Sequence, residues 1–236
     1  MKIGVKCYHE EDFLDYCIKK ADFFEVQGLR GKEYDFLKKY TLPIVIHAEH
    51  NSQGSNPADI TNKKINIESL QQAIKIADSC NSKKIIFHPG FIAHESCSEE
   101  NALKFIKNIK DERILLENMP HEQPPLLMMT PLQTKKFMEK TGKGFIFDLA
   151  HCIIASHYLK KDTIEFIKEF LKLKPKHFHI SGQKWDSMKD LHLPLTECDF
   201  DLKNILKLYP KTAEITLEVS KYDLCLQLFL SEHQQL

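Results

Sequence analysis

Short apolar runs alternate with longer amphipathic runs along most of the 236-residue chain. Eight of the short runs are four to six residues long, rich in β-branched or aromatic side chains and nearly continuous. Such runs are typical of parallel strands that are buried on both faces. The predicted strands are Ile3–Cys7, Phe23–Gln27, Ile44–His47, Lys84–His88, Ile114–Glu117, Gly144–Asp148, His177–Ser181 and Glu214–Val219.

Most of these strands are followed by a run whose apolar residues have helical spacing. Phe166, Ile167, Phe170 and Leu171 share one helix face, and Asp162 is the expected N-cap of that helix. Similar faces start at Phe13, Leu70 and Leu202, and the run Leu224–Leu230 is predicted to be the last helix. Eight β/α units in 236 residues predict an α/β fold, a single (β/α)8 TIM-barrel domain over residues 1–236. An open doubly wound sheet is the alternative.

The composition excludes several classes of protein. Thirty-three Lys and Arg residues balance 33 Asp and Glu residues, which gives no support for a nucleic-acid or acidic-membrane partner. No apolar run approaches the length of a transmembrane helix. Seven cysteines without a Cys-x-x-Cys pair argue against a disulfide framework and favour a reducing, cytoplasmic setting. We expect a monomer with no membrane contact. The unusual number is that of the histidines, twelve in all.

Metal-competent side chains stand at or near the ends of six predicted strands. In a barrel, the carboxyl ends of all strands form one mouth, where this fold places its active sites. A lone histidine at a strand end is more often structural, but here that explanation must hold six times. Because buried ionisable groups need compensation, bound cations are the simplest common explanation. The six residues are His47, His88, Glu117, Asp148, His179 and Glu218.

Three further residues extend this set. His151 follows Asp148 by three positions, and the tripeptide Asp190-Leu191-His192 lies in the long loop after the seventh strand. Together they form a second candidate ligand set of two histidines and one aspartate. Nitrogen and oxygen ligands without thiolate suit Zn²⁺ or Mn²⁺. Of the remaining histidines, His177 is expected to be a hydrogen-bonded core residue, and His94 is expected to be solvated.

These segments resemble the endonuclease IV branch (AP endonuclease family 2) of the xylose-isomerase-like TIM-barrel superfamily. The resemblance covers residues 45–218, about three quarters of the chain. It rests on the order and strand-end placement of several short motifs. They are Val45-Ile46-His47, Phe87-His88-Pro89-Gly90, Leu116-Glu117-Asn118, Phe147-Asp148-Leu149-Ala150-His151, His179-Ile180-Ser181, Asp190-Leu191-His192 and Leu217-Glu218.

The resemblance implies up to three zinc ions and cleavage of DNA phosphodiesters at abasic sites. His47, His88 and Glu117 would hold the first ion, and His151, Asp190 and His192 the third. Glu117, Asp148, His179 and Glu218 would hold the second, so that Glu117 bridges two ions. Clustered cations lower the pKa of bound water and neutralise charge on the entering and leaving oxygens.

The loop that follows the first histidine ligand departs from the endonuclease pattern. In that family the loop carries bulky residues that wedge into DNA, but the stretch Ala48–Ser52 has no Tyr or Leu. His50 and Asn51 are therefore the candidate substrate contacts there. Lys184 and Trp185 in the loop after the seventh strand are candidates for phosphate contact and base stacking. The alternative is that Lys184 is solvated and Trp185 packs on its own loop.

Three functions remain open at this point. The first is a multinuclear hydrolase of phosphodiesters. The second is a sugar isomerase or epimerase with a single divalent ion, in which Glu117 and Glu218 form an acid–base pair. The stretch Leu193–Asp201 favours it, because it resembles a Pro-Leu-Gly-Glu-Gly-Asp-Ile-Asp motif of the superfamily, with Thr196 and Cys198 in place of glycines. The third is a barrel that binds a metal or a partner without catalysis.

Overall fold

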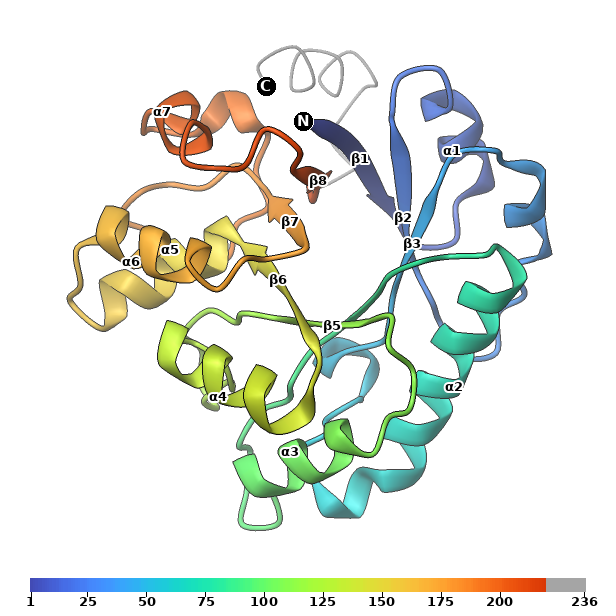
Figure 1. The fold of residues 1–236 in the computed structure, drawn as a ribbon, viewed down its shortest axis with the longest axis horizontal. Helices are drawn as coiled ribbons and strands as arrows, with labels where there is room; N and C mark the ends of the chain where they lie inside the picture. The colour runs from blue at the N-terminus through green and yellow to red at the C-terminus, as the bar shows by residue number, and fades with distance from the viewer. Residues whose placement is uncertain (220–236) are drawn as a thin grey trace.

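The computed structural model describes residues 1–219. Its eight strands are all parallel and form a closed barrel in sequence order, with helices around the outside (Figure 1). Strand β1 pairs with β8, where Gly4 lies opposite Thr216, and this pairing closes the ring. The predicted (β/α)8 barrel is therefore confirmed, and the doubly wound alternative is excluded. The strands are β1 (Lys2–Cys7), β2 (Phe23–Gln27), β3 (Ile44–His47), β4 (Ile85–Phe87), β5 (Ile114–Glu117), β6 (Gly144–Asp148), β7 (His177–Ile180) and β8 (Glu214–Leu217).

Within residues 1–219, an α-helix follows each of the first seven strands except the second. Between β2 and β3 the connection holds only a short 3₁₀ helix, η1 (Asp35–Lys39). Every helix in residues 1–219 is too short or too polar to span a lipid bilayer. The predicted helix Leu224–Leu230 lies outside the described residues. The α-helices are α1 (Glu11–Cys17), α2 (Lys63–Ser79), α3 (Glu99–Lys107), α4 (Pro131–Thr141), α5 (Leu149–Tyr158), α6 (Thr163–Leu171) and α7 (Leu202–Leu206), and the other 3₁₀ helices are η2 (Asn51–Gln53), η3 (Ile60–Asn62) and η4 (Leu195–Glu197).

Helix starts are fixed by side chains that accept backbone hydrogen bonds. Asp162, the predicted N-cap of α6, accepts a bond of 2.9 Å from the Glu165 amide. Asp148 accepts one of 2.7 Å from the His151 amide, so β6 passes directly into α5 at the barrel mouth. One strand-end carboxylate thus sets where the following helix begins and where its His151 lies.

The lower part of the barrel interior is apolar. Phe23, Val45, Ile86, Leu115 and Ile146 are all buried and form a cluster inside the barrel, separate from the larger core between strands and helices. Strand β1 contributes Gly4 to this layer, and a Cβ atom at that position would lie 2.2 Å from the Cε2 atom of Phe23. The aromatic ring therefore fills the space that the glycine leaves. This layer closes the barrel from below, as the fold requires.

Candidate metal centre

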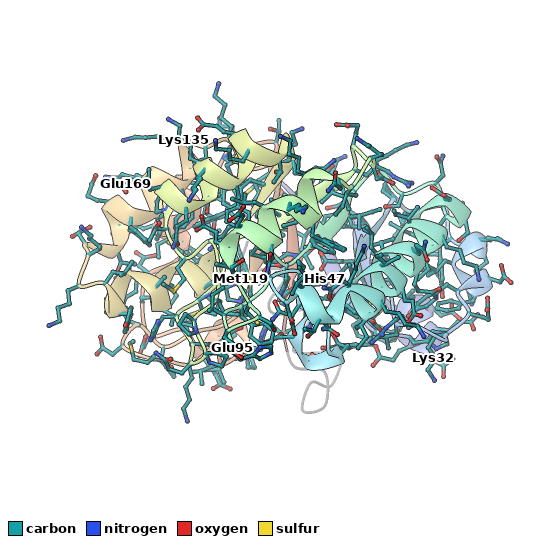
Figure 2. All side chains as sticks on the ribbon, turned by 90° about the horizontal axis from the view of Figure 1, so that it is seen from below. Lys32, His47, Glu95, Met119, Lys135 and Glu169 are labelled. Atoms are coloured by element: carbon teal, nitrogen blue, oxygen red, sulfur yellow. The ribbon has the colours of Figure 1, made fainter. Side chains whose placement is uncertain are left out.

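A ring of buried polar side chains lies directly above the apolar layer. Successive side chains of a strand point to opposite faces, so a residue two positions later points into the barrel one layer higher. The pairs are Phe23 and Glu25, Val45 and His47, Ile86 and His88, Leu115 and Glu117, Ile146 and Asp148, His177 and His179, and Thr216 and Glu218. Figure 2 shows His47 towards the middle of the molecule, with Lys32, Lys135 and Glu169 at its periphery.

The first group of possible ligands consists of His47, His88 and Glu117. Glu117 Oε2 lies 3.5 Å from His47 Nε2 and 3.1 Å from His88 Nε2. Each residue of this group offers a donor atom within 4.8 Å of the others. His47 Nε2 and Glu117 Oε2 are buried, yet neither makes a hydrogen bond of good geometry within residues 1–219. Buried polar atoms are rarely left in this state, so the pair indicates a place for a cation.

The second group surrounds His179. Its Nδ1 atom lies 3.2 Å from Glu117 Oε1, 2.9 Å from Glu218 Oε1 and 4.0 Å from Asp148 Oδ2. Glu117 thus turns one carboxylate oxygen to the first group and the other to the second. This placement matches the bridging role that the resemblance implies for Glu117.

The third group combines His151 with two residues of the β7–α7 loop. Asp190 Oδ2 lies 3.2 Å from His151 Nε2 and 2.8 Å from His192 Nε2. His192 has a left-handed backbone with φ of 47°, and its Nδ1 lies 2.7 Å from the Glu218 carbonyl oxygen. The loop is therefore attached to the end of β8. The structure brings all nine predicted ligands together at the mouth, and their roles as ligands remain predictions.

In four of the candidate histidines, the ring nitrogen that would not bind a metal contacts an oxygen acceptor. A carbonyl oxygen only accepts, so a ring nitrogen bonded to it carries the proton and leaves the other nitrogen's lone pair free. Partners of this kind orient metal-binding histidines. The contacts are His47 Nδ1 to Ala48 O at 2.7 Å, His151 Nδ1 to Asn118 O at 2.8 Å, His192 Nδ1 to Glu218 O at 2.7 Å and His179 Nε2 to Glu25 Oε2 at 2.9 Å.

Two residues of this layer were missed by the sequence analysis, Lys6 and Glu25. Lys6 Nζ contacts Glu218 Oε1 and lies 3.6 Å from Glu25 Oε1. Glu25 is fully buried and also accepts a hydrogen bond of 2.7 Å from the Thr216 hydroxyl. The signal was present in the sequence, because each is a charged residue inside an apolar strand run with its side chain on the interior face.

The charges of this layer are unbalanced without added cations or protons. Five carboxylates (Glu25, Glu117, Asp148, Asp190 and Glu218) lie with one ammonium group, that of Lys6. Burial raises the pKa of Asp148 to about 7, and burial lowers the pKa of His88 to about 4. Burial disfavours the charged form of His192, but the hydrogen bond with Asp190 and the charges of Asp190 and Glu218 together outweigh this and raise its pKa to about 9. Protons therefore supply part of the compensation, and a cation that binds must displace them.

The polar layer opens into a cavity of about 650 Å³. Residues of all three groups line it, and so do Lys6, Tyr8 and Met119. His50 and Asn51, predicted as substrate contacts, also lie in its wall, where their role stays a prediction. The volume lies within the range of sites that bind small molecules, roughly 300–1,000 Å³.

Lys184 and Trp185 are placed differently from the other predicted substrate contacts. Neither is among the residues that line the cavity. Lys184 Nζ donates to the Glu197 carbonyl oxygen at 2.5 Å, and the Trp185 ring packs against Phe200 with ring centroids 5.2 Å apart. These contacts favour the alternative of loop packing for Trp185. A role in substrate binding remains a prediction for both.

The family follows from a comparison of the sequence with models of known families. Residues 34–219 match the model of the xylose isomerase-like TIM barrels. The chain belongs to this family. Its members share the barrel described above, and the polar layer lies at the end where barrels of this kind carry their active sites.

Proteins of known structure that are similar to this chain are named after different enzymes. A D-tagatose 3-epimerase-like protein is 21% identical with a TM-score of 0.76, over 100% of this chain and 97% of its own. Endonuclease IV from Thermus thermophilus is 13% identical with a TM-score of 0.73, over 100% of both chains. At these identities the likeness shows the fold alone.

One curated relative matches in sequence. The uncharacterised protein MJ1311 of Methanocaldococcus jannaschii is 25% identical over an alignment of 185 residues that covers 72% of this chain and 60% of the relative. The chain thus spans about 60% of the length of the curated relative that it matches.

Proposed function

We propose that the protein is a metal-dependent phosphodiester hydrolase similar to endonuclease IV, with cleavage of DNA at abasic sites as its candidate reaction. The observation that carries this proposal is the third group, His151, Asp190 and His192, assembled beside the other two. An isomerase of this superfamily would use one ion on Glu117, Asp148, His179 and Glu218, and it would leave the third group without a role.

The donor atoms suit zinc, with manganese as the alternative. The three groups offer imidazole nitrogens and carboxylate oxygens without a thiolate. His47, His88 and Glu117 would hold one ion, and His151, Asp190 and His192 another. The remaining ion would be held by Glu117, Asp148, His179 and Glu218. Cations held by these residues would supply activation of a water molecule and neutralisation of charge on a phosphoryl group.

The protein's own residues complete the site around an anionic substrate. Lys6 Nζ lines the cavity beside Glu218 and adds a fixed positive charge near the place for a phosphoryl group. Glu25 accepts a hydrogen bond from His179 Nε2 and so keeps His179 Nδ1 aimed at Glu117 and Glu218. Glu117 and Glu218 reach the cavity and are the candidate catalytic residues.

The direct test is the metal content, followed by activity. After purification with excess Zn²⁺, elemental analysis of the Cys97→Ser variant, which lacks the sulfur donor of a separate candidate group outside the mouth, should find two or three ions per chain, and a single ion would reject the proposal. A duplex with one abasic site should then be cut by the zinc-loaded protein. Glu117→Gln should abolish cutting, because it removes the bridging charge, whereas Glu139→Gln on the outer face of α4 should not.

A sugar isomerase or epimerase is the second candidate, favoured by the cavity and by Glu117 and Glu218. The cavity has the size of a small-molecule site, and the two carboxylates lie 3.2 and 2.9 Å from the same nitrogen of His179. This arrangement suits one ion with a carboxylate on each side, which could move a proton beside a carbonyl group. The test is exchange of solvent deuterium into a panel of keto-sugars. Exchange that is lost in both Glu117→Gln and Glu218→Gln would favour this candidate over the hydrolase.

A further inference from the structure

Two loops at the outside of the barrel mouth meet through their backbones. Asp59, just before η3, forms an isolated antiparallel bridge with Cys97 in the β4–α3 loop. The Ser98 amide donates to the Ala58 carbonyl oxygen at 2.9 Å, and the Ile60 amide donates to that of Ser96 at 3.4 Å. This pairing places the side chains of Asp59, His94 and Cys97 side by side, although His94 and Cys97 lie more than 30 residues after Asp59 in the sequence.

The three side chains offer one oxygen, one nitrogen and one sulfur donor within 4.8 Å of one another. His94 Nε2 lies 3.4 Å from Asp59 Oδ2 and 3.8 Å from Cys97 Sγ. Adjacent corners of a tetrahedron of zinc ligands, each about 2.0–2.3 Å from the ion, lie roughly 3.3–3.8 Å apart. The observed separations are therefore those of neighbouring ligands around one ion.

Hydrogen bonds orient the carboxylate of this group. Asp59 Oδ1 accepts from the Thr61 amide at 2.9 Å, from the Thr61 hydroxyl at 2.7 Å and from the Ser96 hydroxyl at 2.9 Å. These bonds hold Oδ1 in place, and they leave Oδ2 turned to His94.

The sulfur of Cys97 lies beside a hydrogen-bond donor. Cys97 is buried, and Asn56 Nδ2 donates to its Sγ atom at 3.6 Å. The thiolate is the form of cysteine that binds a metal. A thiolate, a carboxylate and an imidazole together are a set of zinc ligands.

A catalytic Cys–His–Asp relay is the competing explanation for these three residue types. A relay uses opposite ring nitrogens, one for the cysteine and one for the aspartate. Here Nε2 lies 3.4 Å from Asp59 Oδ2, and Cys97 Sγ lies 3.8 Å from both ring nitrogens. Nδ1, the nitrogen that a relay would turn to the cysteine, is instead 2.9 Å from the Ser96 hydroxyl oxygen. The geometry therefore favours a shared ion over a relay.

We propose that Asp59, His94 and Cys97 bind a zinc ion, with water as the remaining ligand. The site shares no residue with the nine ligands of the mouth, and it does not depend on the proposed function. Binding converts the Cys97 thiol to a thiolate and releases that proton to solvent. The ion would hold the loop before η3 to the β4–α3 loop and so stiffen the mouth next to His50 and His88.

Cobalt is the probe that separates this site from the mouth. The mouth ligands contain no sulfur, so absorption from thiolate-to-cobalt charge transfer can report only a cysteine site. Titration of the metal-free full chain with Co²⁺ should produce this band. Its final intensity should correspond to one thiolate-bound cobalt ion per chain. Cys97→Ser should remove the band, and Cys198→Ser, which changes a half-buried cysteine far from this group in sequence, should keep it.

His94→Ala tests the site without disturbing buried packing, because this side chain is about half exposed, at 52%. It should weaken cobalt binding at the thiolate site by at least about tenfold. His192→Ala in the mouth should leave the band unchanged, so failure of the mouth and failure of this site are separable. The proposal is overturned if the wild type gives no band, or if the band persists in Cys97→Ser.

Discussion

Glu25 Oε2 lies 2.9 Å from His179 Nε2 inside the barrel, and this contact connects Glu25 to the second group of the candidate metal centre. The carboxylate fixes the ring so that Nδ1 faces Glu117 and Glu218. Glu25 is held in turn by the Thr216 hydroxyl, and Lys6 Nζ lies 3.6 Å from its other oxygen. Carboxylate–histidine pairs of this kind both orient a ligand and raise its basicity.

Glu25→Gln should weaken binding of zinc by about 10–100-fold without unfolding the protein. A glutamine can still accept the hydrogen bond from His179, but it lacks the charge that raises the basicity of the ring. The measurement is a competition titration with a chromophoric chelator. Glu139→Gln is the matched control, because it removes one carboxylate from the exposed face of α4. Equal zinc affinity of Glu25→Gln and wild type would contradict this positioning role.

His192→Ala should lower the zinc content at the mouth by one ion per chain. Its Nε2 atom belongs to the third group, which shares no residue with the other two. Elemental analysis of the zinc-loaded variant and of wild type gives the difference directly. His9→Ala is the control, because His9 is exposed and belongs to none of the three groups; its Nε2 lies 2.6 Å from the Glu33 carbonyl oxygen, and its ring packs against Tyr34 and Phe36. An unchanged zinc content would show that His192 is not a ligand.

Zinc affinity at the third group should keep rising with pH above the range of an ordinary histidine. Burial lowers the pKa of His192, but the hydrogen bond to Asp190 and the charges of Asp190 and Glu218 together outweigh burial and raise the pKa to about 9. Only the deprotonated ring binds metal. At any pH below the pKa of His192, zinc must therefore displace a proton from the ring, and this weakens binding. Competition titrations from about pH 6 to about pH 9 should show the increase, whereas a ring with a pKa of about 6.5 would level off near pH 7. Full retention of zinc near pH ~4 would contradict a histidine-rich site.

The fold and the six candidate ligands at the strand ends were predictable because both follow from strand periodicity. The apolar runs gave the strand bounds closely, and parallel strands in a barrel must bring their carboxyl ends to one mouth. The alternation of side chains along each strand then placed His47, Glu117 and Asp148 in one layer. His177, expected as a hydrogen-bonded core residue, is confirmed, since it is buried and its Nε2 lies 2.8 Å from the Thr216 hydroxyl oxygen.

Features that depend on contacts between loops were not predictable in this way. Backbone carbonyl oxygens such as those of Ala48 and Asn118 select the histidine tautomers, and no side-chain pattern encodes them. His94 was expected to be solvated and is about half exposed, but no sequence pattern indicated that an isolated bridge between two loops brings Cys97 to Asp59 beside it. Lys6 and Glu25 were missed for another reason. They lie inside the strands, whereas ligands were sought at the strand ends.

Gly4→Ala should destabilise the barrel by about 1–3 kcal/mol through overpacking. The added Cβ would lie 2.2 Å from Cε2 of Phe23, whose buried ring belongs to the apolar layer and has little room to move. Unfolding in urea, followed by far-UV circular dichroism, measures the loss. The double variant with Phe23→Leu should regain part of it, because the shorter side chain leaves space for the methyl group. Strictly additive losses in the two single variants would argue against the contact.

Asp111→Asn should destabilise the protein at neutral pH and have little effect in acid. Asp111 receives hydrogen bonds from Arg113 Nε at 2.9 Å and from Nη2 at 2.6 Å, and Nη2 also reaches Asp78 at the end of α2. These bonds lower the pKa of Asp111, with the side-chain bond from Arg113 as the main cause. The carboxylate therefore contributes stability above the ordinary aspartate pKa of about 4, and this contribution is lost as pH falls through the lower folded-state value.

The expected loss for Asp111→Asn at neutral pH is about 1 kcal/mol, because the ion pair is only partly shielded from solvent. Urea unfolding of the variant and of wild type at pH ~7 and pH ~3 gives the two differences to compare. Asp186→Asn, at an exposed position of the β7–α7 loop, is the control and should change neither value. A destabilisation of Asp111→Asn that is the same at both pH values would show that the charge of Asp111 is not what stabilises this contact.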